Sequence, residues 1–236
     1  MPDSKTAPAA ALVLFDIDGT LIRRAGPHHR EVLVDAVRAV TGLDSTTDHV
    51  PVQGMLDRDI LEVMLRRAGL GPRAIGEAMQ PIVERAQSLY VRRCPDLRKR
   101  LCPGARRLLY GLYRRRIPTG LVTGNLTRIG WRKMEQSGIR RYFRFGAFAE
   151  QARDRAGLVR LAVREARRQN WIGRDARIAL VGDHPNDILA ARANGVRSVA
   201  VATGLSSAEE LSAHTPDLLV DDLRSLKLET LIGWDS

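Results

Sequence analysis

The chain has 236 residues, of which 44% are hydrophobic and 28% are charged. This length fits one large domain or a core with a smaller insertion, and the composition is typical of a soluble globular protein. No apolar stretch approaches the roughly 18 residues of a membrane-spanning helix. The N-terminal residues are polar, and Asp16 interrupts the apolar run that follows them, which argues against a secretory signal. We therefore expect a cytoplasmic protein.

The formal net charge is +11, and Lys accounts for only four of the 38 basic residues. A basic surface attracts anionic partners, which include both phosphorylated substrates and nucleic acids. The densest basic stretch, Arg92 to Arg116, shows neither a recognisable nucleic-acid-binding module nor stacking aromatic residues. We interpret it as a solvated helix face and do not expect a nucleic-acid partner. The two cysteines, Cys94 and Cys102, lack a metal-binding spacing and are expected to be reduced.

In chain order, the first predicted element is a buried strand over residues 11–15. Helical periodicity follows, with apolar residues three and four apart over residues 31–40, 60–65 and 75–91. Helix ends are indicated by Pro27, Gly42, Gly69 and Pro72. An all-helical insertion is therefore expected after the first strand.

From Pro103 onward, short apolar runs alternate with helical stretches. The predicted strands are 119–122, 145–148, 178–181, 198–202 and 218–220, and the predicted helices are 105–115, 128–137, 158–168, 187–194 and 208–213. Alternation of this kind predicts an α/β fold, with a parallel sheet covered by helices on both faces.

Two carboxylates follow the first predicted strand in the segment Asp16-Ile17-Asp18-Gly19-Thr20. Ligands of open α/β sheets bind at the carboxyl ends of the strands, and side chains two residues apart project from the same face. Two carboxylates held together repel each other unless a cation lies between them, and Mg²⁺ prefers oxygen ligands. An ordinary Asp-Gly turn is the alternative interpretation.

The string from Val13 to Leu21 resembles the first motif of the haloacid dehalogenase-like (HAD) superfamily of phosphohydrolases. The resemblance extends over most of the chain and is to the phosphoglycolate-phosphatase-like branch. It implies a three-layer Rossmann-like core, residues 11–23 and 102–236, with a helical cap, residues 24–101, inserted after the first motif. Residues 1–10 are then expected to form a flexible tail.

In this resemblance, Asp16 is the nucleophile and forms an aspartyl-phosphate. Asp18 protonates the leaving group and later deprotonates water. Gly19 and Thr20 form the turn and lie against the substrate. The carbon–halogen hydrolases of the superfamily lack the second Asp, so the presence of Asp18 favours a phosphatase.

The superfamily's second motif is similar to Thr123-Gly124-Asn125, which also follows a predicted strand. The resemblance implies that the Thr123 hydroxyl and the Gly124 N–H bind a phosphate oxygen and that Asn125 lies near the substrate. Structural capping by Thr123 remains the alternative.

The third motif normally supplies a Lys, or less often an Arg, that neutralises the nucleophile and the phosphoryl oxygens. Lys133 follows Thr123 too closely for this position and is expected to belong to the next helix. Arg155 fits the position best and Arg153 second, and either can bind phosphate in a bidentate manner.

The fourth motif resembles Gly182-Asp183-His184-Pro185-Asn186-Asp187. The resemblance implies that Asp183, Asp16 and the backbone carbonyl of Asp18 ligate Mg²⁺. Asp187 is expected to hold a metal-bound water or the third-motif cation, and His184 is expected to be a loop residue.

These observations predict a Mg²⁺-dependent phosphomonoester hydrolase that acts on a small phosphorylated metabolite, as a monomer or homodimer. A phosphotransferase or sugar-phosphate mutase of the same superfamily is an alternative, and a nucleic-acid-associated protein is an alternative of another class. Polar residues early in the insertion are weaker candidates for substrate contact, with a solvated surface as the preferred interpretation: Arg23, His28, His29, Gln53 and Arg58.

Overall fold

A parallel sheet runs through the larger part of the molecule in a computed structural model that describes residues 7–23 and 26–232. Its six strands, in the spatial order β3-β2-β1-β4-β5-β6, all pair in parallel within the described residues. The strands are β1 (Ala9–Phe15), β2 (Thr119–Val122), β3 (Phe145–Ala147), β4 (Ile172–Gly182), β5 (Arg197–Val201) and β6 (Leu218–Val220). The predicted fold class is confirmed.

Alternate residues of the central strand β1 are buried on opposite faces of the sheet. Leu12 and Leu14 belong to one hydrophobic cluster, whereas Val13 and Phe15 belong to the other, because successive side chains of a strand point in opposite directions. The first cluster contains residues of α6 (Arg155–Arg168) and α7 (Pro185–Arg192), and the second those of α4 (Ala105–Arg114) and α9 (Leu228–Ile232). Two further helices of this part are α5 (Thr127–Gln136) and α8 (Ala208–Ala213). Helices therefore cover both faces, as expected.

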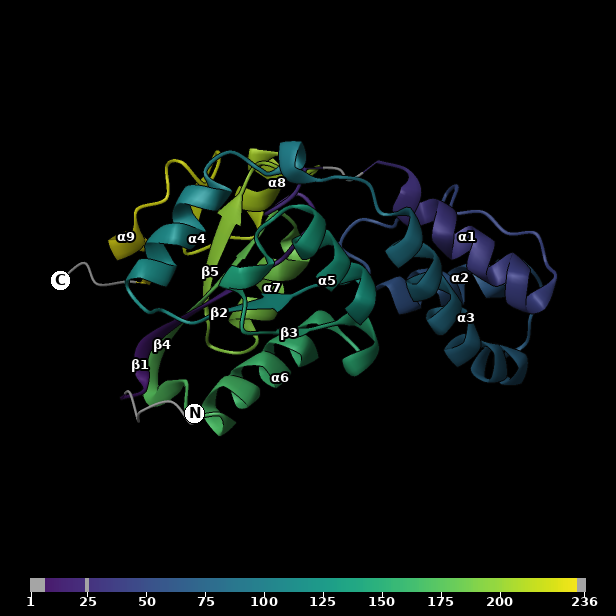
Figure 1. Cartoon of the computed structure of the whole chain (residues 1–236), viewed down its shortest axis with the longest axis horizontal. Helices are drawn as coiled ribbons and strands as arrows, with labels where there is room; N and C mark the ends of the chain where they lie inside the picture. Colours follow the sequence, from purple (N-terminus) through teal and green to yellow (C-terminus); the bar gives the residue numbers. More distant parts are fainter. Residues whose placement is uncertain (1–6, 24–25, 233–236) are drawn as a thin grey trace.

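The three α-helices that follow β1 in the chain lie beside the sheet, at the right of Figure 1. They are α1 (His28–Thr41), α2 (Asp57–Arg67) and α3 (Pro72–Arg93). Gly42 ends α1 in the left-handed conformation (φ 73°), and Pro72 begins α3 at a first-turn position. These helix boundaries follow the Pro and Gly positions in the sequence.

The segments that lead into and out of the three helices lie side by side. Ile22 and Leu101 form an antiparallel bridge, and the Arg23 N–H donates to the Arg100 carbonyl at 2.7 Å. The inserted helices are therefore joined to the sheet at one place, close to the end of β1.

Some elements differ from the expected ones. β1 begins at Ala9, within the residues expected to be a tail, and residues 1–6 lie outside the described part of the chain. β4 begins at Ile172, six residues before the predicted strand, and its register with β1 shifts between Ala9 and Ala11. Half of the six added residues of β4 are exposed and only Ile172 is buried, so they lack the apolar run on which the prediction depended.

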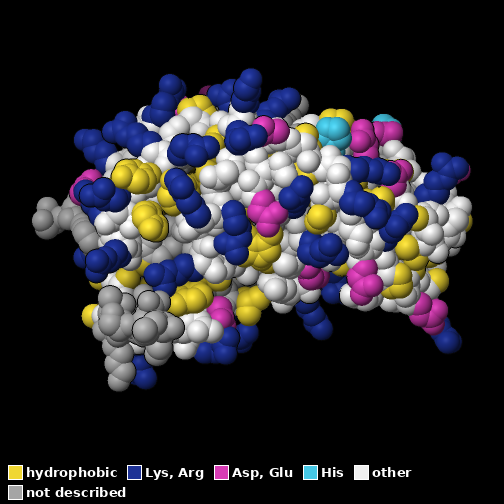
Figure 2. Space-filling view, in the orientation of Figure 1, with side chains coloured by type: hydrophobic (Ala, Val, Ile, Leu, Met, Phe, Trp, Pro, Cys, Tyr) yellow, Lys and Arg dark blue, Asp and Glu magenta, His cyan; other side chains and the backbone are white. Residues whose placement is uncertain are grey.

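Basic side chains lie over both parts of the molecule on the face shown in Figure 2 and do not gather on one element. On α4, however, Tyr110 and Tyr113 are 50% and 61% exposed, and the Arg114 guanidinium lies 6.0 Å from the Tyr110 ring centre. The basic stretch therefore includes exposed aromatic rings. No helix in the described part of the chain is long and apolar enough to cross a bilayer.

Candidate active site

The acidic motifs meet at the carboxyl ends of two neighbouring strands. Asp16 directly follows β1, Asp183 follows β4, and the two strands pair in parallel with Phe15 opposite Val181. The strands β2 and β3 lie on one side of β1, and β4, β5 and β6 lie on the other, so the strand order reverses at β1. Ligands of open α/β sheets bind beside such a reversal, at the carboxyl ends of the strands. The structure thus brings together the first and fourth motifs.

Three buried carboxylates form the centre of the site. Each of Asp16, Asp183 and Asp187 offers an oxygen, and these oxygens all lie within 4.8 Å of one another. Burial raises the pKa of Asp183 well above its usual value, and the negative charges of Asp16 and Asp187 raise it further. The cluster therefore carries unfavourable repulsion that a cation would relieve.

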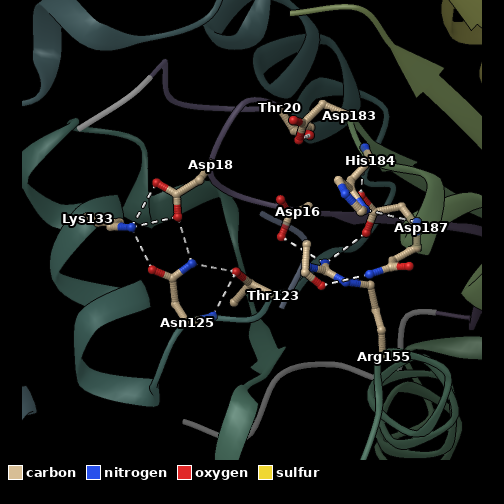
Figure 3. A network of polar contacts seen from close by, with 12 residues as sticks. Asp16, Asp18, Thr20, Thr123, Asn125, Lys133, Arg155, Asp183, His184 and Asp187 are labelled. Carbon is tan, nitrogen blue, oxygen red and sulfur yellow. Dashed lines mark hydrogen bonds and ion pairs between the residues drawn. The ribbon is translucent and has the colours of Figure 1, made fainter. Parts of the chain in front are cut away.

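Arg155, at the start of α6, contacts two of these carboxylates (Figure 3). Its Nη1 lies 3.1 Å from Asp16 Oδ1 and 2.8 Å from Asp187 Oδ1, while its buried Nε has no hydrogen-bond partner. The side chain of Arg153 is exposed. Of the two arginines considered from the sequence, Arg155 is therefore the one that reaches the nucleophile position.

The turn after Asp18 fits closely around Asp183. Gly19 adopts a φ of +87°, and a Cβ built there would lie only 2.1 Å from Asp183 Oδ2. The Thr20 hydroxyl donates to Asp183 Oδ1 at 2.9 Å and is fully buried. Thr20, expected beside the substrate, thus orients a metal-ligand candidate instead.

Asp18 points away from the other acids and toward α5 (Figure 3). Its oxygens lie 2.8 and 2.6 Å from Lys133 Nζ, and Asn125 Nδ2 donates to Oδ2 at 2.8 Å. Burial acts to raise the pKa of Asp18, but the charge of Lys133 and the hydrogen bonds from Lys133 and Asn125 more than offset it, so the pKa lies below its usual value. These contacts therefore favour the carboxylate form of Asp18 over the protonated form.

The second motif lies on the opposite side of Asp16 from Asp187. The Thr123 hydroxyl oxygen accepts from Asn125 Nδ2 at 2.8 Å and is fully buried. Gly124 packs against the segment that precedes α2, because a Cβ at Gly124 would lie 2.3 Å from the Met55 carbonyl oxygen. Asn125 is thus engaged with Thr123 and Asp18 at once.

Lys133 is the main residue that sequence reasoning missed. It belongs to α5, as expected, but its side chain is fully buried and reaches Asp18. Its position in the sequence does indicate burial, since it lies on the face of α5 that also carries the buried residues Ile129, Gly130 and Met134. A Lys on the buried face of a helix requires a partner.

A cavity of ≈ 920 Å³ lies between the inserted helices and the carboxyl ends of the strands. Among its lining residues are most of the predicted site residues: Asp16, Asp18, Gly19, Gly124, Asn125, Arg155 and Asp183. The inserted segment contributes Arg23, His29 and Gln53, whereas His28 and Arg58 are not among the lining residues. Thr20, Thr123 and Asp187 support the site from behind.

The residues present suit a hard divalent cation. The cluster offers only carboxylate oxygens, and its three negative charges are opposed by one guanidinium, that of Arg155. The sequence assigned the metal to Asp16, Asp183 and the backbone carbonyl of Asp18, and the cluster of carboxylate oxygens consists of Asp16, Asp183 and Asp187. The Asp18 side chain, which is occupied by Lys133, is not part of it.

Comparison with known proteins agrees with this geometry. The family model described as haloacid dehalogenase-like hydrolase matches residues 10–195. Phosphoglycolate phosphatase 1 of Pseudomonas aeruginosa is 27% identical over 226 residues, which cover 91% of this chain and 78% of the relative. Phosphoglycolate phosphatase of Pseudomonas putida is 26% identical with the same coverage.

Solved structures share the fold. CbbY from Rhodobacter sphaeroides, in complex with phosphate, superposes with a TM-score of 0.71 at 21% identity and covers 94% of this chain and 99% of its own. A β-phosphoglucomutase from Clostridium difficile gives a TM-score of 0.67 at 20% identity, with 94% of both chains covered. The chain belongs to the haloacid dehalogenase-like hydrolase family, and the family expected from the first motif is confirmed.

Proposed function

We propose that this chain hydrolyses the phosphomonoester of a small metabolite through an aspartyl-phosphate on Asp16. The observation that carries the proposal is the contact of Arg155 with Asp16 beside two further buried acids, at the floor of the cavity. Phosphoryl transfer depends mainly on positioning and on fixed charge around the phosphoryl group, and this arrangement supplies both.

In the first half of the reaction, an Asp16 oxygen attacks phosphorus while the bond to the leaving oxygen breaks. Arg155 offsets the charge on the nucleophile through the contact of its Nη1 with Asp16. The protonated form of Asp18 passes its proton to the leaving oxygen, and the product alcohol departs.

In the second half, water attacks phosphorus, and the bond to Asp16 breaks. Asp18 accepts the proton of that water, so its carboxylate form is needed at the start of this step. Lys133 favours that form by contacting both Asp18 oxygens. Inorganic phosphate leaves, and both acids return to their initial states.

Asp16 and Asp183, with Asp187 beside them, are the residues that would hold Mg²⁺. A cation bound there would screen the mutual repulsion of the acids and the negative charge of the phosphoryl group. Thr20 and Arg155 orient two of these carboxylates from behind, through the hydroxyl contact to Asp183 and the guanidinium contact to Asp187.

The cavity favours a small anionic substrate. Its lining includes three arginines contributed by the inserted helices and their connections, Arg23, Arg30 and Arg100. Because curated relatives are named phosphoglycolate phosphatases, phosphoglycolate is the first compound to test, followed by sugar phosphates and nucleoside monophosphates.

The decisive experiment measures release of inorganic phosphate from a panel of phosphorylated metabolites, with Mg²⁺ and with a chelator. We expect turnover that requires the cation and is lost in Asp16→Asn, which keeps the shape of the side chain but removes its nucleophilic charge. Trapping with hydroxylamine, followed by peptide mass analysis, should locate the acyl-phosphate at Asp16.

Matched variants separate this mechanism from a general loss of folding. Asp35→Asn changes an exposed carboxylate on α1 that pairs with Arg93, and it should keep full activity. Undiminished turnover in Asp16→Asn, or in the presence of the chelator, would contradict the proposal.

A further inference from the structure

Lys133 is a fully buried cation that the reaction scheme uses only through Asp18. Burying an ammonium group costs free energy unless its charge is paired and its N–H groups donate hydrogen bonds. Its surroundings therefore indicate what it does.

The three N–H groups of Lys133 have three partners (Figure 3 shows two of them). Nζ lies 2.6 Å from Asp18 Oδ2, 2.6 Å from Asn125 Oδ1 and 3.2 Å from His29 Nδ1. Because an ammonium group has only three donors, none remains for a phosphoryl oxygen. Lys133 thus acts on the substrate through Asp18 and does not bind the substrate itself.

His29 continues the network into the inserted helices. Lys133 can only donate, so His29 Nδ1 accepts, which assigns the proton to Nε2. His29 Nε2 then donates to Asp57 Oδ2 at 2.9 Å, and the same oxygen accepts from the Leu126 N–H at 2.9 Å. The chain of hydrogen bonds runs from Asp18 through α1 and α2 back to α5.

The third inserted helix contributes the ring that encloses this network. The Tyr90 ring on α3 lies 5.9 Å from Lys133 Nζ and packs edge-on against His29. The Asp18 side chain, in contrast, is 38% exposed and opens on the cavity. One end of the network is therefore enclosed by the inserted helices, while the other faces the space where the leaving group lies.

We propose that Lys133 is a positioning residue that holds the Asp18 carboxyl group toward the leaving oxygen and makes that orientation depend on His29 of the inserted helices. The inference rests on the proposed phosphomonoesterase function. When α1 lies in its observed position, the hydrogen bond to His29 holds the Lys133 side chain in place. Lys133 in turn holds the Asp18 carboxylate. Without His29, the ammonium group loses one of its three restraints.

The test uses para-substituted phenyl phosphates, which differ in leaving-group basicity but little in size. A poorly aligned Asp18 lowers kcat/KM most for substrates with basic leaving groups, because these leave only when Asp18 transfers a proton to the leaving oxygen. In Lys133→Met we expect kcat/KM to fall about tenfold to a hundredfold more for the most basic phenol than for p-nitrophenyl phosphate. The neighbouring Arg132→Met, which removes a guanidinium paired with Glu135, should keep the wild-type dependence.

A double-mutant cycle tests whether Lys133 acts through Asp18. If Lys133 acts through Asp18, adding Lys133→Met to Asp18→Asn should change the leaving-group dependence no further. His29→Ala, which changes a cavity-lining side chain and leaves the ion pair intact, should show the same steepening in smaller degree. It also serves as the decisive variant if Lys133→Met does not fold.

An equal loss for all phenols in folded Lys133→Met would overturn the inference, and so would an unchanged dependence in His29→Ala. Additive effects in the Asp18→Asn background would overturn it as well. These outcomes differ from failure of the proposed function, which is seen in the wild-type enzyme as an absence of metal-dependent phosphate release.

Discussion

The Asp57 carboxylate on α2 accepts a hydrogen bond from the Leu126 backbone N–H at 2.9 Å, at the start of α5. Two more N–H groups at this helix end also donate to side chains: that of Thr127 to Glu150 and that of Arg128 to Gln87 of α3. The inserted helices thus supply the cap of the helix that carries Lys133. Their seating and the geometry of α5 are physically coupled.

Asp57→Ala is expected to lower the free energy of unfolding by about 1–2 kcal/mol, since it removes a helix cap and leaves a buried N–H unpaired. Urea denaturation measures this change. Asp59→Ala is the matched control, because Asp59 lies in the same first turn of α2 with the same relation to the helix dipole but caps no other helix. Equal losses in the two variants would argue against the capping role.

Arg155 provides a second prediction. Arg155→Met should reduce kcat about 10²–10³-fold, a magnitude typical of removing one preorganised charge-stabilising donor. Arg155→Lys should recover part of the loss, because an ammonium group keeps the charge but not the planar set of guanidinium donors. Arg153→Met tests the neighbouring exposed arginine in the same segment and should behave as wild type. A larger loss in Arg153→Met than in Arg155→Met would reverse the assignment.

At Gly124 the second motif packs directly against the inserted segment. In Gly124→Ala the new Cβ would lie 2.3 Å from the Met55 carbonyl oxygen, so one backbone segment has to move. We expect a lower melting temperature and a loss of kcat/KM of more than about tenfold, because a small displacement of a positioned group is costly in catalysis.

Gly76→Ala is a matched control for which we expect the opposite change in stability. It lies within α3 with open space around it, so Gly76→Ala should raise stability by about 0.5–1 kcal/mol through helix propensity alone. A Gly124→Ala protein as stable and active as Gly76→Ala would show that the close packing of Met55 is not required.

Metal binding has a thermodynamic signature that is independent of turnover. A cation that relieves the repulsion among Asp16, Asp183 and Asp187 binds only the folded state and therefore stabilises it by mass action. Mg²⁺ should raise the melting temperature of the wild type, and a chelator should reverse the change. In Asp183→Asn, which removes one charge and one ligand oxygen, the metal-dependent shift should disappear.

The metal-free proteins supply the complementary comparison. Since burial and like charges raise the pKa of Asp183, removing its charge should leave the metal-free variant at least as stable as the wild type. A Mg²⁺-dependent shift of equal size in Asp183→Asn would indicate that the cation binds elsewhere.

The strand pattern and the motif spacings predicted much of this arrangement. Apolar runs located all six strands, and the placement of acids directly after two of them brought Asp16 and Asp183 to one edge, since parallel strands end together. Arg155 was found through the family resemblance, as the residue that best fits the third-motif position, and it stands at the start of a helix that packs on the sheet.

The Lys133 network was beyond such reasoning. Its members come from α1, α2 and α5, and no spacing along the chain reveals which turns of inserted helices meet which turn of a core helix. Lys133 was assigned to the correct helix, but its function depends on the direction of its side chain. The apolar positions of α5 indicate that the side chain points into the core, but they do not show which groups it meets there.

Cys102 offers a prediction on pH. Burial raises the pKa of its thiol to about 11, and Sγ donates to the Gly19 carbonyl at 3.5 Å. Near pH 7 only about one molecule in ten thousand then carries the thiolate, which is the reactive form. Alkylation of Cys102 in the folded protein should be very slow at neutral pH, whereas the unfolded chain should react rapidly at both cysteines.

The same shift has a consequence for stability. The unfolded thiol ionises near pH 9.0, below the pKa of the folded state, so the unfolded form gains relative stability as the pH rises from about 9 to about 11. Cys102→Ser should remove this part of the alkaline destabilisation, measured as the pH dependence of urea unfolding. Equal alkylation rates for Cys102 in folded and unfolded protein at pH 7 would contradict its burial behind Gly19, and with it the packing of the turn that carries Asp18.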